Sequence, residues 1–421
     1  MTMEKSVGCW CGLDWQSCGF GDKGDVVQGR LMQQPGKRVR YKSHDKGIPT
    51  AVKDEEEIHD IKRAFEENSR SPTDAKLLCR FTPSYREGVY PYGVCTHFIY
   101  ASVPNHPSAE NRRHKDVLYS YDPNAFRKFL HVRETAPDVR LLLSVDVEAM
   151  LRTGWSAQRL AKDARVWLDR SGVDGLHLSG LDVLPRSIHN VLGIITALRA
   201  SFRDRYLITI GVDRTQKTVE QDLLAILRTV DFASFQTSRV RHTDARTTLV
   251  NPYGKYENNT STFFFNYEVE RLAQLAAKEP KSRVCFTLTL GGNQFELEDA
   301  TQHGLGAPAK HTKDASYSEI CKRDWDEVKY IAPALGFYAH KGKTWVGYDT
   351  EKTIASKVRK ALERYPGFCV MLVQVDRDDY EGACSEKHFP LAQSVKQALL
   401  QPHRTRSRSL LLFCIPRRDG S

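Results

Sequence analysis

The sequence predicts an α/β fold: a (β/α)8 TIM barrel with an additional module inserted between strands seven and eight. Eight short apolar runs are separated mostly by segments of helical periodicity, which is typical of parallel strands covered by helices. About 75 residues separate the last two runs, far more than an ordinary crossover loop needs. The 421 residues have room for a barrel of about 250–300 residues, an insertion and two tails.

The barrel elements are expected in chain order. Strands are expected over residues 76–82, 96–103, 140–147, 173–183, 206–212, 232–238, 283–291 and 368–376. Helices are expected over 122–135, from 156, over 188–202, through 223–230, through 269–275 and over 390–400. Asp122, with Pro123 after it, and Ser156 are suitable residues for helix starts.

Four regions are expected on this basis. A poorly ordered, cysteine-containing leader occupies 1–72, with a short amphipathic helix over 54–70, and a basic disordered tail occupies 401–421. The barrel takes 73–291 and 362–400, and the inserted domain takes 292–361. Cys9, Cys11 and Cys18 of the leader lack the second ligand pair of a zinc module, so no metal site is expected. No cofactor is expected either.

The distribution of basic residues and the length of the apolar runs argue against nucleic-acid binding and against a membrane span. A net charge of +10 and a pI near 9.0 permit attraction to anionic surfaces. The basic residues are dispersed, however, which favours a solvated basic surface over a nucleic-acid-binding face. No run approaches the roughly 18 apolar residues that would cross a membrane, so no membrane span is expected.

Two observations about the compartment conflict. Ten cysteines suggest disulfides and an oxidising compartment. The first thirty residues lack the apolar core of a signal peptide. Either the chain is cytosolic with free thiols, or the sequence begins at a truncated or mispredicted start. The placement of the cysteines favours the second, and we expect an extracellular, secreted protein.

The most informative stretch is the expected fourth strand, 173–183. Strand side chains alternate, so His177, Ser179 and Leu181 share one face, and Leu176 and Leu178 share the other. The two leucines suit packing against an outer helix layer. The other three side chains are therefore expected to point into the barrel.

This strand resembles the fourth strand of glycoside hydrolase family 18, which comprises chitinases and chitinase-like lectins and has the signature D-G-x-D-x-D-x-E. Asp174 and Gly175 match it, whereas the three later acids fall on His177, Ser179 and Leu181. The resemblance implies that the family's proton-donating Glu is Leu181 here. General acid catalysis contributes about 10²–10⁴-fold, and an alkyl side chain transfers no proton.

Other segments extend the resemblance from about residue 76 to 400. Residues 306–309, 317–321 and 343–349 match recurring phrases of the domain that the family inserts between strands seven and eight, so the resemblance implies a small α+β domain there. Trp345 is expected in the core of this domain rather than as a sugar platform. The resemblance implies the disulfides Cys79–Cys95 and Cys321–Cys384. Cys285 and Cys369 lie on neighbouring strands and are expected to be buried free thiols. Residues 258–261 hold two overlapping glycosylation sequons. Any pairing of Cys9, Cys11, Cys18, Cys285, Cys369 and Cys414 stays open.

The family's sugar-binding positions are also changed. The resemblance implies that the tyrosine holding the substrate's N-acetyl oxygen is Ser238, its neighbouring acid Arg239, and the floor tryptophan Val373. The third strand has 144–147 where the family has S-x-G-G. The expected lining of the barrel mouth is Arg80, Ser102, Asp146, His177, Ser179, Gln236, Ser238 and Arg239. This set could bind a small anion or polar ligand, but an internal salt-bridge network is favoured.

The sequence thus predicts a secreted, monomeric, catalytically inactive chitinase-like protein that binds or signals. Chitin or another glycan containing N-acetylglucosamine, or a protein, is the expected partner. The alternative is a chitin- or glycan-binding lectin with a remodelled cleft. A weakly active chitinase that recruits Asp146 or Asp182 is less favoured, because Asp182 faces away from the interior unless a bulge re-aims it.

Overall fold

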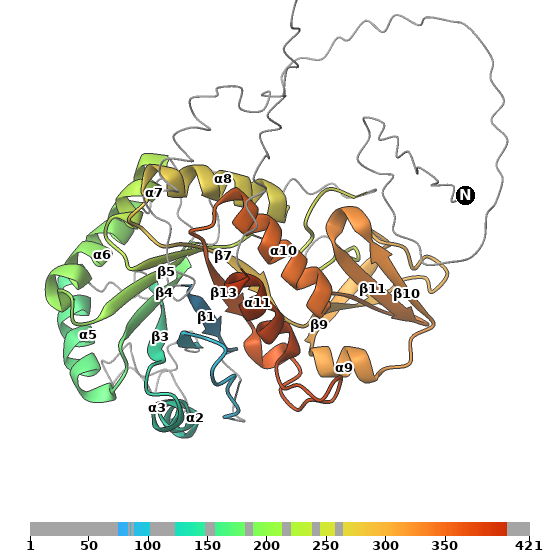
Figure 1. Ribbon diagram of the computed structural model, residues 1–421, viewed down its shortest axis with the longest axis horizontal. Coiled ribbons are helices and arrows are strands. Elements are labelled where there is room, and N and C mark those ends of the chain that lie inside the picture. The colour runs from blue at the N-terminus through green and yellow to red at the C-terminus, as the bar shows by residue number, and fades with distance from the viewer. Residues whose placement is uncertain are drawn as a thin grey trace, which may run out of the picture. The chain divides into compact units, whose positions relative to one another are not determined.

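The structure, a computed structural model, describes residues 75–82, 85, 88–101, 123–147, 156–181, 188–212, 220–237, 245–256 and 264–401. These residues form a closed parallel barrel with the strand order β1-β13-β7-β6-β5-β4-β3-β2 (Figure 1). A five-stranded antiparallel sheet, in the order β10-β11-β12-β8-β9, lies between β7 and β13 in the sequence. The predicted (β/α)8 barrel with an inserted α+β domain is therefore confirmed.

Strands and helices alternate along most of the barrel. The barrel strands are β1 (Leu77–Arg80), β2 (His97–Ala101), β3 (Arg140–Asp146), β4 (Gly175–Leu181), β5 (Leu207–Val212), β6 (Phe232–Phe235), β7 (Val284–Thr289) and β13 (Cys369–Val373). The barrel helices are α2 (Pro123–Leu130), α3 (Val132–Thr135), α5 (Ala157–Ser171), α6 (Ile188–Phe202), α7 (Glu220–Leu227), α8 (Phe265–Lys278), α10 (Glu351–Arg364) and α11 (Pro390–Leu400). The insertion contains β8 (Gly292–Leu297), β9 (Ala309–Ala315), α9 (Tyr317–Lys322), β10 (Glu327–Ile331), β11 (Gly336–Lys341) and β12 (Thr344–Tyr348).

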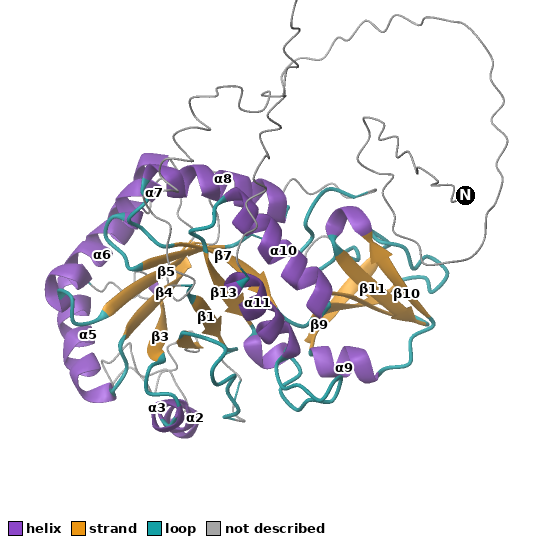
Figure 2. Cartoon of the chain, viewed as in Figure 1, coloured by secondary structure: helices purple, strands orange, loops and turns teal. Residues whose placement is uncertain are grey.

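Alternation along the strands divides the barrel's apolar residues into two clusters. Leu176 and Leu178 of β4 belong to the large cluster shared with the helices, as predicted. Leu78, Ile99 and Met371 belong to a separate cluster made by strand residues of the opposite alternation, inside the barrel. Figure 2 shows helices α5 to α8 on the outside of the barrel strands.

Local signals in the sequence explain several helix ends. The Ser156 side chain accepts a hydrogen bond from the Arg159 backbone N–H at 3.2 Å and begins α5. Gly172 ends α5 with φ of 76°, a left-handed conformation that glycine adopts without strain. Helices α6 and α11 have the predicted bounds. The single helix predicted over 122–135 is instead two helices, α2 and α3, separated by His131.

The inserted sheet has its own apolar core. Trp345 of β12 is fully buried, stacks on Tyr338 with ring centroids 5.3 Å apart, and donates its indole N–H to the His303 carbonyl oxygen at 3.1 Å. Its predicted place in the core of the insertion is confirmed. The indole holds the loop between β8 and β9 against the sheet.

Helix α10 belongs with the barrel by its packing. Its buried residues Ile354, Val358 and Leu362 lie in the large barrel cluster. Its first eleven residues, 351–361, were expected within the insertion, because a sequence gives no sign of which core an amphipathic face meets. The last strand of the inserted sheet ends at Tyr348.

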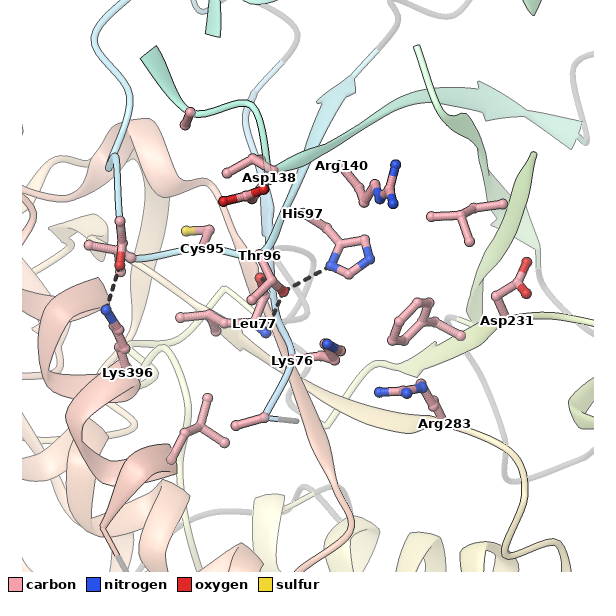
Figure 3. A pocket seen from close by; sticks show the side chains of 18 of the residues that line it. Lys76, Leu77, Cys95, Thr96, His97, Asp138, Arg140, Asp231, Arg283 and Lys396 are labelled. Atoms are coloured by element: carbon pink, nitrogen blue, oxygen red, sulfur yellow. Dashed lines mark hydrogen bonds between the residues drawn. The ribbon is translucent and has the colours of Figure 1, made fainter. Parts of the chain in front are cut away.

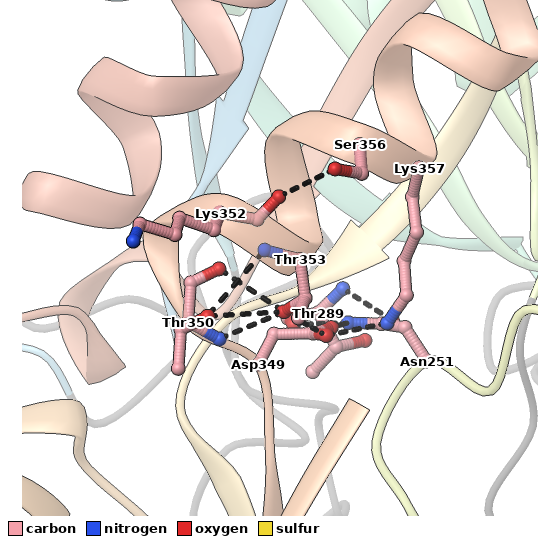
Figure 4. Close-up of polar contacts among 8 residues, drawn as sticks. All are labelled: Asn251, Thr289, Asp349, Thr350, Lys352, Thr353, Ser356 and Lys357. Atoms are coloured by element: carbon pink, nitrogen blue, oxygen red, sulfur yellow. Dashed lines mark hydrogen bonds and ion pairs between the residues drawn. The ribbon is translucent and has the colours of Figure 1, made fainter. Parts of the chain in front are cut away.

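A buried polar network joins the end of the insertion to the barrel (Figure 4). The Lys357 ammonium is ion-paired with the Asp349 carboxylate, and each side chain is 1% exposed. Asn251 donates to Asp349 at 2.9 Å and to the carbonyl oxygen of Thr289, in β7, at 2.8 Å. Burial lowers the pKa of Lys357, and the Asp349 charge opposes that shift. The network fixes where β12 passes into α10.

Three disulfides occur among the described residues. Cys79–Cys95 and Cys321–Cys384 are the two pairs that the resemblance implied. The second joins α9 of the insertion to the segment before α11. Cys285 and Cys369 are also bonded, so the expectation of two free thiols was wrong. The two residues are register partners on the adjacent parallel strands β7 and β13 and belong to the interior cluster, which places their side chains together.

Replacing both Cys285 and Cys369 with alanine lowers the free energy of unfolding by about 2–4 kcal/mol, because the bridge closes a long loop in the unfolded chain. Urea denaturation of the oxidised protein measures the loss. Non-reducing peptide mass spectrometry of the unsubstituted protein should recover a peptide pair joined through these cysteines. Two unlinked, alkylatable peptides would contradict the bond.

Among the helices in the described ranges, none combines the length and apolar character needed to cross a membrane.

Candidate functional site

The carboxyl ends of the strands are the functional end of this fold. Five of the predicted lining residues lie in the described part of the chain: Arg80, Asp146, His177, Ser179 and Gln236. Ser102, Ser238, Arg239 and Asp182 lie outside the described residues, as do the leader, the tail beyond residue 401 and the sequons at 258–261. Leu181 is the last residue of β4.

His177 is buried in the barrel, and its Nδ1 is hydrogen-bonded to the neighbouring strand. Its Nδ1 lies 2.8 Å from the Thr209 hydroxyl oxygen, and that hydroxyl is 3.4 Å from the Leu176 carbonyl oxygen. We assign the Nδ1–H tautomer, because the Thr209 hydroxyl can then accept from His177 and donate to Leu176. A Cβ at Gly211 would lie 3.1 Å from Nε2, so the backbone of β5 closes over the ring.

Burial lowers the pKa of His177 to about 3, with a smaller contribution from the Arg80 charge. The imidazole is therefore neutral near pH 7. It lies where the family signature has its first inward acid. Its Nδ1 is held by Thr209, which fixes the orientation of the ring inside the barrel.

Ser179, at the second of these positions, is bonded to β3. Its Oγ accepts from the Ser144 hydroxyl at 3.0 Å and donates to the Val145 carbonyl oxygen at 3.3 Å. Asp146 is its register partner on β3 and is partly exposed. Asp146 is the one carboxylate among the five described lining residues.

Strand β4 carries a bulge where the signature ends. Leu178 pairs with Ile210, but Leu181 pairs with Val212, so β4 has one more residue than β5 between these pairs. The expectation that Asp182 faces away from the interior assumed unbroken alternation. The bulge removes that assumption, because one extra residue reverses the side to which the later residues of a strand point.

The neighbouring strand ends are linked by hydroxyl groups. Thr237, which lies just beyond β6, donates its hydroxyl to the Thr287 carbonyl oxygen of β7 at 2.5 Å, and its N–H to the Thr287 hydroxyl at 3.2 Å. Asp376, after β13, accepts from the Thr82 N–H at 2.7 Å and from its hydroxyl at 2.6 Å. Val373, at the family's tryptophan position, ends β13 and is partly exposed. The described mouth is therefore polar and rich in small residues.

A cavity of ≈ 990 Å³ lies at the opposite, amino-terminal end of the barrel (Figure 3). His97 lies in its wall, with Nδ1 2.8 Å from the Thr96 hydroxyl and its ring packed 4.8 Å from that of Phe232. Burial, and then the charge of Lys76, lower the pKa of His97 to about 3. Residues at this end of such barrels chiefly contribute stability. The cavity lies away from the predicted sugar cleft.

The sequence did not single out Thr209 or Gly211. Both belong to β5, and only the strand register places them beside His177. The sequence offered one weak sign that these positions are special: a threonine and a glycine lie two residues apart in an otherwise apolar strand.

Comparison with known proteins places these observations in a family. The model for "Glycosyl hydrolases family 18" matches residues 75–378. Probable chitinase 10 of Drosophila melanogaster is 24% identical over 375 residues, which are 78% of this chain and 16% of that protein. Chitotriosidase-1 of Mus musculus is 24% identical over 378 residues, covering 79% of each chain. The chain thus spans a small part of the Drosophila relative and most of the mouse one.

The fold also matches a solved structure. Human YKL-39, described as a pseudo-chitinase with retained chitooligosaccharide binding properties, superposes with a TM-score of 0.63 at 21% identity. The match covers 78% of this chain and 100% of that one. At this identity the likeness concerns the fold.

Proposed function

The chain belongs to the glycosyl hydrolases of family 18, and on that premise we propose that it is a non-catalytic, chitinase-like member retained for binding or signalling. One observation carries the proposal: the signature acids of β4 are replaced by a buried neutral imidazole, a strand-bonded hydroxyl and an aliphatic side chain. These are His177, Ser179 and Leu181.

Hydrolysis of a glycosidic bond needs a group that protonates the leaving oxygen. In the family this is the last acid of the signature, and leucine has no dissociable proton. His177 is protonated only near pH 3 and is enclosed by β5. The hydroxyl of Ser179 is not acidic enough to replace a carboxylic acid, since general acids work best with a pKa near the working pH.

The three disulfides support an oxidising compartment, and we propose that the protein is secreted and monomeric. Reduced cytosolic surroundings would leave the interior pair Cys285 and Cys369 unbonded. A bridge between the insertion and the barrel is likewise a feature of proteins outside the cytosol.

Glycan binding is the second candidate function. It is favoured by the description of YKL-39, which joins the pseudo-chitinase state with retained chitooligosaccharide binding. The partly exposed Arg80, Asp146 and Gln236 offer hydrogen-bonding groups for hydroxyls at the barrel mouth. Against it stands Val373, which gives a sugar ring no aromatic face to stack on.

We expect no hydrolysis of a fluorogenic chito-oligosaccharide. The turnover should be at least about 10²-fold below that of mouse chitotriosidase-1 assayed alongside, which is the scale of a lost general acid.

The double variant Ser179→Asp, Leu181→Glu should remain inactive, because the tyrosine and tryptophan positions are still unfilled. Asp182→Ala tests the bulge, since turnover that this change abolishes would show a re-aimed acid and overturn the proposal. Substantial turnover by the double variant would show that the sugar platforms matter less than proposed.

A binding assay separates the two candidates. Oxidised protein retained on chitin beads, and released by soluble chito-oligosaccharide, indicates the lectin function. Protein that passes through chitin beads while mouse chitotriosidase-1 is retained indicates a function without chitin.

A further inference from the structure

Two histidines and a glutamate meet on the inserted domain, far in sequence from the signature strand. They are His303, in the loop between β8 and β9, Glu327 of β10 and His340 of β11. One ligand atom from each lies within 4.8 Å of the others. We propose that this cluster is a binding site for a divalent transition metal ion of the Zn²⁺ type.

The sheet places two of the three groups. Glu327 and His340 are direct cross-strand partners in the antiparallel pair β10–β11, so their side chains share one face of the sheet. The Glu327 Oε2 atom lies 3.3 Å from Nε2 of His340. The position of this pair is set by backbone hydrogen bonds rather than by the side chains.

The third group is held by the core of the insertion. The buried Trp345 donates its indole N–H to the His303 carbonyl oxygen at 3.1 Å, which fixes the loop over the same face. The His303 ring then stacks on that of His340 with centroids 3.8 Å apart. Its Nδ1 lies 3.2 Å from Glu327 Oε2.

These separations match a metal site. Two ligand atoms bound to one tetrahedral Zn²⁺, each about 2.0–2.2 Å from it, lie about 3.3–3.5 Å apart. The two separations that involve Glu327, 3.2 and 3.3 Å, are of this size, and the two histidine nitrogens lie within 4.8 Å of each other. Imidazole nitrogen with one carboxylate suits zinc and its neighbours, whereas magnesium and calcium prefer oxygen ligands alone.

Hydrogen bonds do not account for the close approach of these ligand atoms. Nδ1 of His303 and Oε2 of Glu327 are both shielded from solvent, as is Nδ1 of His340. The contacts of 3.2 and 3.3 Å within the cluster are ion-pair distances, but none of these three atoms makes a hydrogen bond within the described residues. A buried polar atom that makes no hydrogen bond costs about 1–3 kcal/mol. One cation placed between the His303 nitrogen and the Glu327 oxygen would satisfy both, and the nitrogen of His340 would complete three protein ligands, leaving a fourth position for water.

The consequence is a cross-link within the insertion. Metal bound here joins the 298–308 loop to the β10–β11 hairpin, on the side of the inserted sheet that carries Trp345. The site is separate from the barrel mouth, so a negative result for metal binding would not affect the proposed function.

Titration of tag-free, EDTA-treated full-length protein with ZnCl₂, by calorimetry and native mass spectrometry, should show one Zn²⁺ per chain at this site. His340→Gln and Glu327→Gln should each weaken binding at least tenfold, as expected for loss of one of three ligands. His131→Gln, an exposed histidine on the barrel, is the matched control and should bind as the unsubstituted chain does. MgCl₂ should not compete.

Hydrogen exchange gives a second measurement that does not depend on the variants folding. Zn²⁺ should slow amide exchange in 298–308 of the unsubstituted protein and leave the barrel helices unchanged. Absence of bound zinc, zinc binding that both glutamine variants retain, or unchanged exchange in this loop would each overturn the proposal. Zinc bound by the leader cysteines would be retained by both glutamine variants, so it would be recognised as binding at another site.

Discussion

Replacing Lys357 with methionine lowers the free energy of unfolding by about 3–5 kcal/mol, the scale of a broken buried ion pair. Methionine fills a similar volume, so the loss comes from charge rather than from a cavity. The Asp349 carboxylate would keep its bonds from Asn251 and Thr353 but would lose the Lys357 ammonium that balances its charge. Urea denaturation followed by tryptophan fluorescence measures the change.

Lys352→Met is the matched control, because Lys352 lies on the same helix with its side chain exposed. It should change the free energy of unfolding by less than about 0.5 kcal/mol. The double variant Asp349→Asn, Lys357→Met should be less destabilised than the sum of its two single variants, since removing both charges leaves no unbalanced ion. Additive losses would show that the pair is not coupled.

This network also shows why the insertion's end was hard to predict. Its members Asn251, Thr289 and Asp349 are distant in sequence, and an amphipathic helix such as α10 displays its apolar face without showing which core receives it. Periodicity sufficed for α6 and α11, whose bounds agree with prediction. The order of strands could be predicted from their alternation with helices, because a parallel barrel has few other ways to connect them.

The sequence predicted which residues occupy the candidate site, but it did not predict which residues they contact. That His177, Ser179 and Leu181 fall on the signature acids is evident in the sequence. The partners of these residues depend on register, and the bulge in β4 changes the register at the residue where the signature ends. Cys285 and Cys369 illustrate the same limit: neighbouring strands were evident, but their direct pairing was not.

The cluster of His303, Glu327 and His340 had no sequence signal. Metal-binding motifs are recognised by short fixed spacings, whereas these ligands come from a loop and two strands. Only the hairpin register and the Trp345 hydrogen bond bring them together.

Acid should destabilise the protein through His177. Its pKa is lowered from 6.5 to about 3 in the folded chain, so below pH 6.5 the unfolded chain binds a proton that the folded chain does not. Stability is therefore complete above pH 6.5 and falls as the pH drops toward 3, by about 1.4 kcal/mol per pH unit for this one group. His97 adds a second contribution of the same sign.

His177→Gln should reduce the pH slope of the unfolding free energy between pH 6.0 and 4.5 by about 1.4 kcal/mol per pH unit. Comparing variant with unsubstituted protein at each pH cancels the carboxylates that titrate in both. His189→Gln, on the exposed side of α6, is the control and should leave the slope unchanged. An unchanged slope in His177→Gln would mean that the folded protein protonates this imidazole near pH 6. His177 would then be able to carry a proton near neutral pH, and the part of the proposal that rests on a neutral imidazole would fail.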